Sequence, residues 1–511
     1  MAEILKREYD IVVLKAELVD EGREHDIALF TLQYHEDTSD RLLIDGPSWK
    51  GPLSSIVPRS ELRRRRSSAD EPDFYLPTGM LADLADWFHS ETQGNVSLWV
   101  HLVKPYGLLR YVPWERLIGK TLNIPVLMLP DFIFPPPREA LAVLDVVLCG
   151  SAPLHYERHT VLQGLMQAIE RIVESGDRRV HLHVFCDSEL RDAIVNSAPA
   201  WLLNDKNVTI YDPAKAAPYV EESLSSRLVD QSGAIRSPWL LWIRDVMAKR
   251  SVDVVHFVCH GYYNGRHGAL LFAQSPIERT EQYLAGPVSA VELDTFLTQV
   301  GAWSSVFTSL PDNASEVGLR GLADEVAQMR PGPMMMHVAS EDPSGYQLAD
   351  GYRFLYSQNN VAPPASTTAL FIYCQPYLAA DRVGVSPHLD VEVPLEEGSR
   401  TGLLSDSSGL LGAFRNRAQV LAALHSVASS SPLGGFFEGD ENAPAVVSST
   451  ERFAEKIQLR YQQLARDAVL PTDMGEREMR AVLGTVDKLK EAVATLESVE
   501  NKAGEQGAAA V

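Results

Sequence analysis

The hydrophobic pattern divides the chain into an N-terminal mixed region and a longer region of alternating strands and helices. In residues 1–135, the runs "DIVVLKAEL" and "DIALFTLQY" predict paired strands, and "NVSLWVHLV" predicts another strand. The stretch "PTGMLADLADWF" has helical spacing, because its large apolar residues recur every three or four positions. We therefore expect an N-terminal α+β lead-in region over 1–135.

The pattern changes in residues 136–395, where apolar runs alternate with amphipathic stretches. The predicted strands are ALAVLDVVLCG, RVHLHVFCD, NVTIYD, VDVVHFVCH, SSVFTS and PMMMHVA, and two of the predicted helices are VLQGLMQAIERIV and LRGLADEVAQM. Nearly continuous apolar strands separated by helices predict an α/β domain with a mostly parallel sheet, covered by helices on both faces. Functional side chains of such a sheet gather at the carboxyl ends of its strands.

The last part of the chain has a different composition. Residues 396–450 are rich in Gly, Ser and Ala and read as a connector with one helical segment, Leu410–Val427. Residues 451–511 predict a C-terminal helical segment, in which apolar residues from Met479 to Leu496 are spaced alternately by three and four. This seam predicts self-association or binding of a protein partner, with packing against the body of the protein as the alternative.

Composition restricts the partners. The chain has 511 residues and a net charge of -22, which argues against nucleic acid as a partner. The basic run Arg63–Arg66 is expected on an exposed loop. The N-terminus has no signal-like apolar core, no apolar stretch is long enough to cross a membrane, and the four cysteines are widely spaced. We therefore expect a cytoplasmic protein without a disulfide framework and without a membrane anchor.

The stretch "VVHFVCHGYYNG" places Cys259 beside His260 after a run of strand-forming residues. Neighbouring residues of a strand point to opposite faces, so these two side chains cannot form a catalytic dyad within a strand. We expect Cys259 to be a small buried hydrophobe. We expect His260 to end its strand, just before Gly261, where a catalytic imidazole of an α/β sheet is commonly found.

Four segments carry a resemblance to the CHAT family, a branch of the caspase-like cysteine peptidases. "VDVVHFVCHGYYNGRHGALLF" is similar to the histidine motif of that family, and "GLLRYVPWERL" resembles the segment that often precedes the family's core. "SAVELDTFLTQVGAWSSVFTS" resembles the helix and strand that lead to the catalytic cysteine. "GLRGLADEVAQMRPGPMMMHVASEDPSGYQLADGYRFLYS" resembles the helix, strand, loop and helix that follow it. The similar part covers residues 105–360, and it implies a caspase-like fold.

The resemblance assigns the catalytic imidazole to His260, but the nucleophile position differs from the family pattern. The family's cysteine ends a strand, and the corresponding segment "VFTSLPDN" has Leu310 at that place. A leucine offers His260 neither a thiol nor a hydroxyl to activate. Gly261, Ser309 and Asp312 would border the same cleft. The resemblance therefore implies a pseudoprotease that serves as a binding or regulatory component, as in prokaryotic signalling or defence modules.

Alternatives remain open at this point. Cys374 ends the apolar run "TTALFIYC" and is the alternative nucleophile of an active cysteine endopeptidase, and Ser309 is a weaker one. A third possibility is an adaptor that holds a small ligand in the empty cleft.

Other motifs give no metal or cofactor. His181 and His183 share one strand face, whereas Cys186 lies on the other, and zinc needs several ligands that converge. The pair His155 and His159 lacks the HExxH order of a zinc peptidase, and no phosphate-binding glycine motif is present.

Overall fold

The computed structural model describes most residues from 11 to 379, with gaps of which the longest are 57–73, 131–142 and 222–234. Several sequence predictions lie outside the described residues. These are the exposed loop at Arg63–Arg66, the side chain of Asp312, the connector over 396–450 with its helical segment, and the C-terminal segment over 451–511.

The elements follow the alternation predicted from the sequence. The strands are β1 (Ile11–Asp20), β2 (His25–Tyr34), β3 (Leu43–Pro52), β4 (Leu98–Leu102), β5 (Val126–Met128), β6 (Val143–Gly150), β7 (Arg179–Cys186), β8 (Val208–Ile210), β9 (Val254–Tyr263), β10 (Gly268–Ala273), β11 (Ala285–Val288), β12 (Ser304–Ser309), β13 (Met334–Val338) and β14 (Leu370–Tyr373). The α-helices are α3 (Thr78–Glu91), α4 (Trp114–Leu122), α5 (Arg158–Ser175), α6 (Ser188–Ser197), α8 (Ala217–Glu221), α10 (Pro238–Val246), α11 (Ala290–Val300), α12 (Asn313–Met329) and α13 (Tyr346–Tyr356). Short 3-10 helices include η2 (Gly107–Tyr111).

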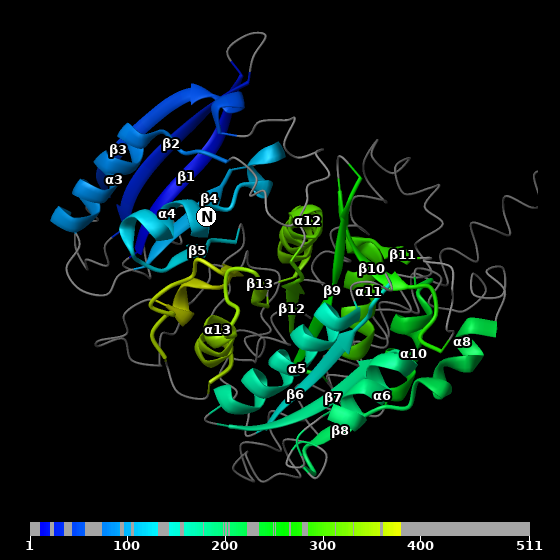
Figure 1. Cartoon of the computed structure of the whole chain (residues 1–511). Coiled ribbons are helices and arrows are strands. Elements are labelled where there is room, and N and C mark those ends of the chain that lie inside the picture. Colours follow the sequence, from blue (N-terminus) through cyan, green and yellow to red (C-terminus); the bar gives the residue numbers. More distant parts are fainter. Residues whose placement is uncertain are drawn as a thin grey trace, which may run out of the picture.

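All of the described strands belong to one sheet, whose main strand order is β3-β2-β1-β4-β5-β14-β13-β12-β9-β6-β7-β8 (Figure 1). Most neighbours are parallel, but β1, β2 and β3 pair antiparallel, and β14 is antiparallel to β13. β10 and β11 form an antiparallel extension of β9. The N-terminal strands therefore belong to the same sheet as the later α/β region, and β14 joins the two by pairing with β5.

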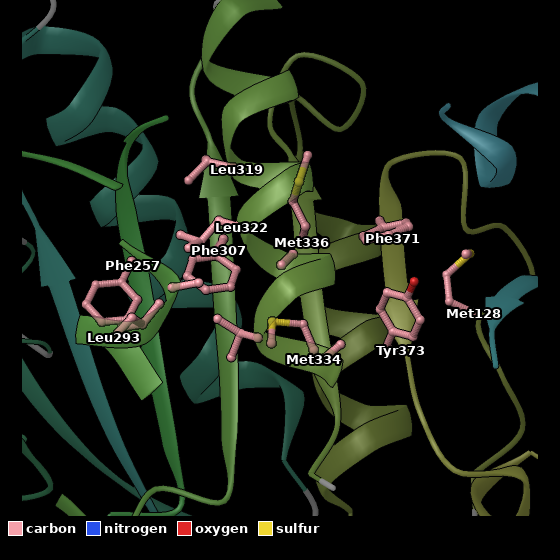
Figure 2. Close-up of a cluster of buried hydrophobic side chains, with 14 of the residues drawn as sticks. Met128, Phe257, Leu293, Phe307, Leu319, Leu322, Met334, Met336, Phe371 and Tyr373 are labelled. Atoms are coloured by element: carbon pink, nitrogen blue, oxygen red, sulfur yellow. The ribbon is translucent and has the colours of Figure 1, made fainter. Parts of the chain in front are cut away.

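Helices cover both faces of the sheet, as the apolar strands require. We call the side that contains Leu319 and Leu322 the α12 face, and α4, α10 and α11 lie on it as well. The other side contains Leu165 and Leu348 and is called the α5 face, because α5 and α13 cover it. Figure 2 shows the α12 face as a row of apolar side chains from Phe257 through Met336 to Met128, so one core spans the junction of the two regions.

Candidate functional site

His260 lies on β9 and is buried, with 3% of its surface exposed. The expectation that it ends its strand is wrong, because β9 continues to Tyr263. The cause is β10, which pairs antiparallel with the last residues of β9 and sets Leu271 opposite His260. However, the main sheet does stop at this level, since the register with β12 ends at Cys259. His260 thus lies where β9 leaves the sheet at its carboxyl edge.

Leu310 follows β12 and lies level with His260. The parallel register pairs Ser309 with Cys259, so the next residue of each strand lies at the same level. Both are on the α5 face, because side chains alternate along a strand and Val258 belongs to that face. Leu310 is 2% exposed, and it packs against α5 at Gly164, as Val258 does. A Cβ atom at Gly164 would lie 3.3 Å from Leu310 Cδ2, so the missing side chain leaves the space that Leu310 fills.

Two of the residues predicted to border the cleft, Ser309 and Gly261, do not face the imidazole. By the same alternation, Ser309 and Cys259 point to the α12 face, away from His260. The Ser309 hydroxyl donates a hydrogen bond to the Leu310 carbonyl at 3.3 Å. Gly261 packs against α12, where its N–H donates to the Ser315 hydroxyl and a Cβ atom would lie 2.2 Å from the Ser315 carbonyl oxygen. Gly261 thus allows α12 to approach β9 closely.

Cys374 lies far from His260. It follows β14, which is antiparallel to β13, so it is near the amino ends of the parallel strands. Three strand spacings of about 4.8 Å and about six residues along the strands separate the two positions, which gives roughly 20 Å or more between them. The geometry therefore does not allow a hydrogen bond between the Cys374 thiol and His260.

The chemistry of the cysteines leads to the same conclusion. All four cysteines of the chain are free and buried. Burial raises the pKa of the Cys374 and Cys259 thiols well above their usual range, and it does the same for Cys149 and Cys186, with smaller contributions from neighbouring groups. A cysteine nucleophile reacts as the thiolate, which a lowered pKa and solvent access favour. None of the four thiols meets these conditions.

The segment "GLLRYVPWERL" forms η2 and the start of α4, and its charged residues hold α12. Arg320 donates two hydrogen bonds to the Glu115 carboxylate, at 2.9 and 2.6 Å, and both side chains are 1% exposed. Arg116 pairs with Glu316 at 2.9 Å. Burial alone raises the pKa of Glu316, but Arg116 and Arg320 outweigh it and lower that pKa overall. These ion pairs therefore fix the helix that begins just after Leu310.

A buried polar chain crosses three strands on the α5 face, and sequence reasoning missed it. His256 on β9 lies 3.0 Å from the Tyr352 hydroxyl through Nδ1 and 2.8 Å from Thr308 Oγ1 through Nε2. Thr308 Oγ1 lies 3.3 Å from His337 Nδ1, and His337 Nε2 lies 3.3 Å from Asp342 Oδ2. A signal was present in the sequence, since His256 and His337 interrupt otherwise apolar strands.

A second histidine cluster lies on β6 and β7. His181 Nδ1 and His183 Nε2 lie 3.4 and 3.5 Å from Asp145 Oδ1, and His183 Nδ1 lies 3.1 Å from the Tyr211 hydroxyl. Within the described ranges, no group of three or more His, Cys, Asp and Glu residues is arranged to hold a metal ion.

Comparison with known proteins gives no relative. No family model matches the chain, and no curated protein and no solved structure matches it significantly. In the part of the chain that the structure describes, no helix has the length and apolar character needed to cross a membrane.

Proposed function

We propose that the chain is a catalytically degenerate, caspase-like protein of the CHAT type, which acts by binding a protein partner and not by cleaving one. The observation that supports the proposal is the position of Leu310, which follows the Ser309–Cys259 register pair and so lies level with His260 at the carboxyl edge of the sheet. An imidazole can act as a general base only on a thiol or hydroxyl within hydrogen-bond reach, and the leucine side chain provides neither.

The state of the thiols supports the same proposal. A peptidase that used Cys374 would need His260 beside it, but the two lie at opposite ends of the parallel strands. The four buried free thiols also agree with a cytoplasmic location, which is part of the proposal. A binding or regulatory component of a prokaryotic signalling or defence module is the role that the CHAT resemblance favours, and it rests on that resemblance alone.

The test is labelling with a cysteine-directed active-site probe, followed by mass spectrometry. We expect no labelling of the folded wild type, and reaction of all four cysteines after denaturation, which controls for thiols that are already oxidised. The His260→Ala variant is the matched control. Stoichiometric labelling of one cysteine in the folded wild type that is lost in His260→Ala would overturn the proposal.

The binding role requires a second measurement. Once a protein partner is identified, we expect that partner to co-elute with the chain in size-exclusion chromatography. The mass of the partner should stay that of the intact protein. A partner that is shortened by wild type, but left intact by His260→Ala, would show that the chain is an active peptidase.

A further inference from the structure

The junction between β5 and β14 has little backbone pairing. Both strands are described in full, and Tyr373 with Met128 is the one register pair between them. The Cys374 N–H reaches the Met128 carbonyl at 3.4 Å, which is long for such a hydrogen bond. By contrast, three residues of β4 pair with β5, and four residues of β13 pair with β14. The sheet is therefore weakly paired along this line and better paired on both sides of it.

Side chains supply much of what the backbone lacks at this junction. The Thr367 hydroxyl accepts the Val126 N–H at 2.9 Å and donates to the Val126 carbonyl at 3.2 Å, in a buried position. On the α12 face, the side chains of Phe371 and Tyr373 lie beside that of Met128 (Figure 2). The two sides of the junction are thus joined mainly through side chains.

The helix α12 spans the junction, because it contacts elements on both sides. Toward β14, the Arg320 guanidinium lies 4.6 Å from the centre of the Phe371 ring, and the Tyr373 hydroxyl donates to the Asp324 carboxylate at 2.6 Å. Toward α4, which precedes β5, the same guanidinium donates to both carboxylate oxygens of Glu115. Arg320 therefore links the two sides of the junction through one charged group.

Burial makes the Glu115–Arg320 pair sensitive to the loss of either partner. Both side chains are almost fully closed to solvent, so an arginine without its carboxylate would leave a buried charge that is poorly compensated. Arg116 also reaches from α4 to α12, but its pair with Glu316 is more exposed and has one hydrogen bond. The closed junction therefore depends most on the Glu115–Arg320 pair.

We propose that the chain opens along the β5–β14 junction as two cooperative units, and that Glu115 and Arg320 form the latch that keeps the junction closed. The first unit comprises the described residues between 11 and 129, and the second those between 143 and 376. In the open state, β1 to β5 and α4 have separated from α12 and β14, while the strands from β6 to β14 stay paired. Both latch residues then reach water, so neither charge stays buried. This inference concerns the fold and does not depend on the proposed function.

The test is hydrogen exchange of the full-length protein in low concentrations of urea, measured by mass spectrometry of its peptides. Amides of β1 and β4 are expected to exchange through a shared opening that depends less on urea than the opening that exposes amides of β6 and β9, because it exposes less surface.

A substitution inside the second unit distinguishes two units from one. Val184 is buried on β7, far from the junction in the strand order, and Val184→Ala is expected to lower the protection of β6 and β9 about tenfold. The protection of β1 and β4 should stay unchanged, since their opening leaves β7 folded. An equal loss of protection in both sets would show that the chain opens as a single unit, and would refute the proposal.

Glu115→Gln tests the latch itself. It is expected to lower the protection of β1 and β4 by about a hundredfold or more, because the loss of one partner from a buried ion pair is costly. The matched control is Asp350→Asn, which removes a carboxylate from an exposed pair with Arg353 and should change protection less than about threefold. A change in Glu115→Gln as small as in this control would show that the pair is not the latch.

Thr367→Val keeps the proposal testable if Glu115→Gln does not fold. It removes the hydroxyl from the junction with little change in shape and leaves the buried Val126 N–H without its acceptor. The protection of β1 and β4 is expected to fall about tenfold. Protection equal to that of the wild type would show that the chain does not open at this junction.

Discussion

Truncation of Leu310 tests whether the position that the CHAT resemblance assigns to the nucleophile is part of the core. Leu310 is 2% exposed and, like Val258, packs against the bare backbone of Gly164. Leu310→Ala removes three buried carbon atoms and leaves a cavity, which costs about 2–5 kcal/mol of unfolding free energy at such sites. A leucine at the edge of an open cleft would cost much less, since truncating an exposed side chain creates no cavity.

A second substitution, at Gly164 opposite Leu310, tests the same packing. Gly164→Ala adds a methyl group 3.3 Å from both Leu310 Cδ2 and Val258 Cγ1. In the wild type, the gain of about 1 kcal/mol from replacing a helical glycine is offset by crowding of about 1–3 kcal/mol. In the Leu310→Ala background the methyl group enters the vacated space. The substitution should therefore be more favourable there by about 1–3 kcal/mol.

The assay is urea unfolding of the four proteins, followed by tryptophan fluorescence. Gly79→Ala is the matched control, because it also lies in a helix but a Cβ atom there has nothing within 4 Å. Its effect should be equal in both Leu310 backgrounds. If Leu310→Ala costs less than about 1 kcal/mol, or if Gly164→Ala has the same effect in both backgrounds, Leu310 does not fill the space opposite α5.

Three further predictions follow from buried charges and from the C-terminal pattern. Burial lowers the pKa of His256 from 6.5 to about 3, so the contribution of the neutral imidazole to stability is complete above pH 6.5 and falls as the pH approaches 3. Between pH 6.5 and 4, the wild type should therefore lose about 3 kcal/mol more unfolding free energy than His256→Gln. Equal losses in the two proteins would contradict this. Glu115→Gln should cost about 3–5 kcal/mol by leaving Arg320 without its main partner, whereas Glu115→Leu with Arg320→Met should recover most of the loss in thermal unfolding. Deletion of residues 472–511 should lower the molar mass measured by light scattering from that of an oligomer to that of a monomer. If the full-length chain is already a monomer, the apolar residues from Met479 to Leu496 bind a different partner or pack against the body of the protein.

The strands of the α/β region were predictable because each is a short apolar run between amphipathic helices. β6, β7, β9, β12 and β13 all lie where the pattern places them, and the mostly parallel sheet with helices on both faces is confirmed. The junction at β14 was not predictable. A short apolar run such as "LFIY" does not reveal its direction, and the pairing of β14 with β5 depends on residues more than 200 positions apart.

The candidate site was predictable only in part, for a similar reason. The period of two along a strand was enough to show that Cys259 and His260 point to opposite faces. It could not show that β9 continues past His260, because that extension depends on pairing with β10. Likewise, His256, Thr308 and His337 lie on three strands far apart in sequence, and only the register brings their side chains together.

The packing of Leu310 bears on the binding role that we propose. A cleft that had lost its thiol but still held a small ligand would be expected to keep a small residue there, since that leaves room for the ligand. Leu310 instead occupies the space against Gly164, and both it and His260 are almost fully buried. This argues against the adaptor with a ligand in the empty cleft. If the chain binds a protein as we propose, the binding surface is expected to lie outside the Leu310 position. The exposed residues next in sequence to the two buried side chains are Pro311, directly after Leu310, and Tyr262, two residues after His260. A partner that binds at this edge of the sheet would contact these exposed residues before it could reach the imidazole, so substitutions at Pro311 or Tyr262 should weaken its binding more than His260→Ala does.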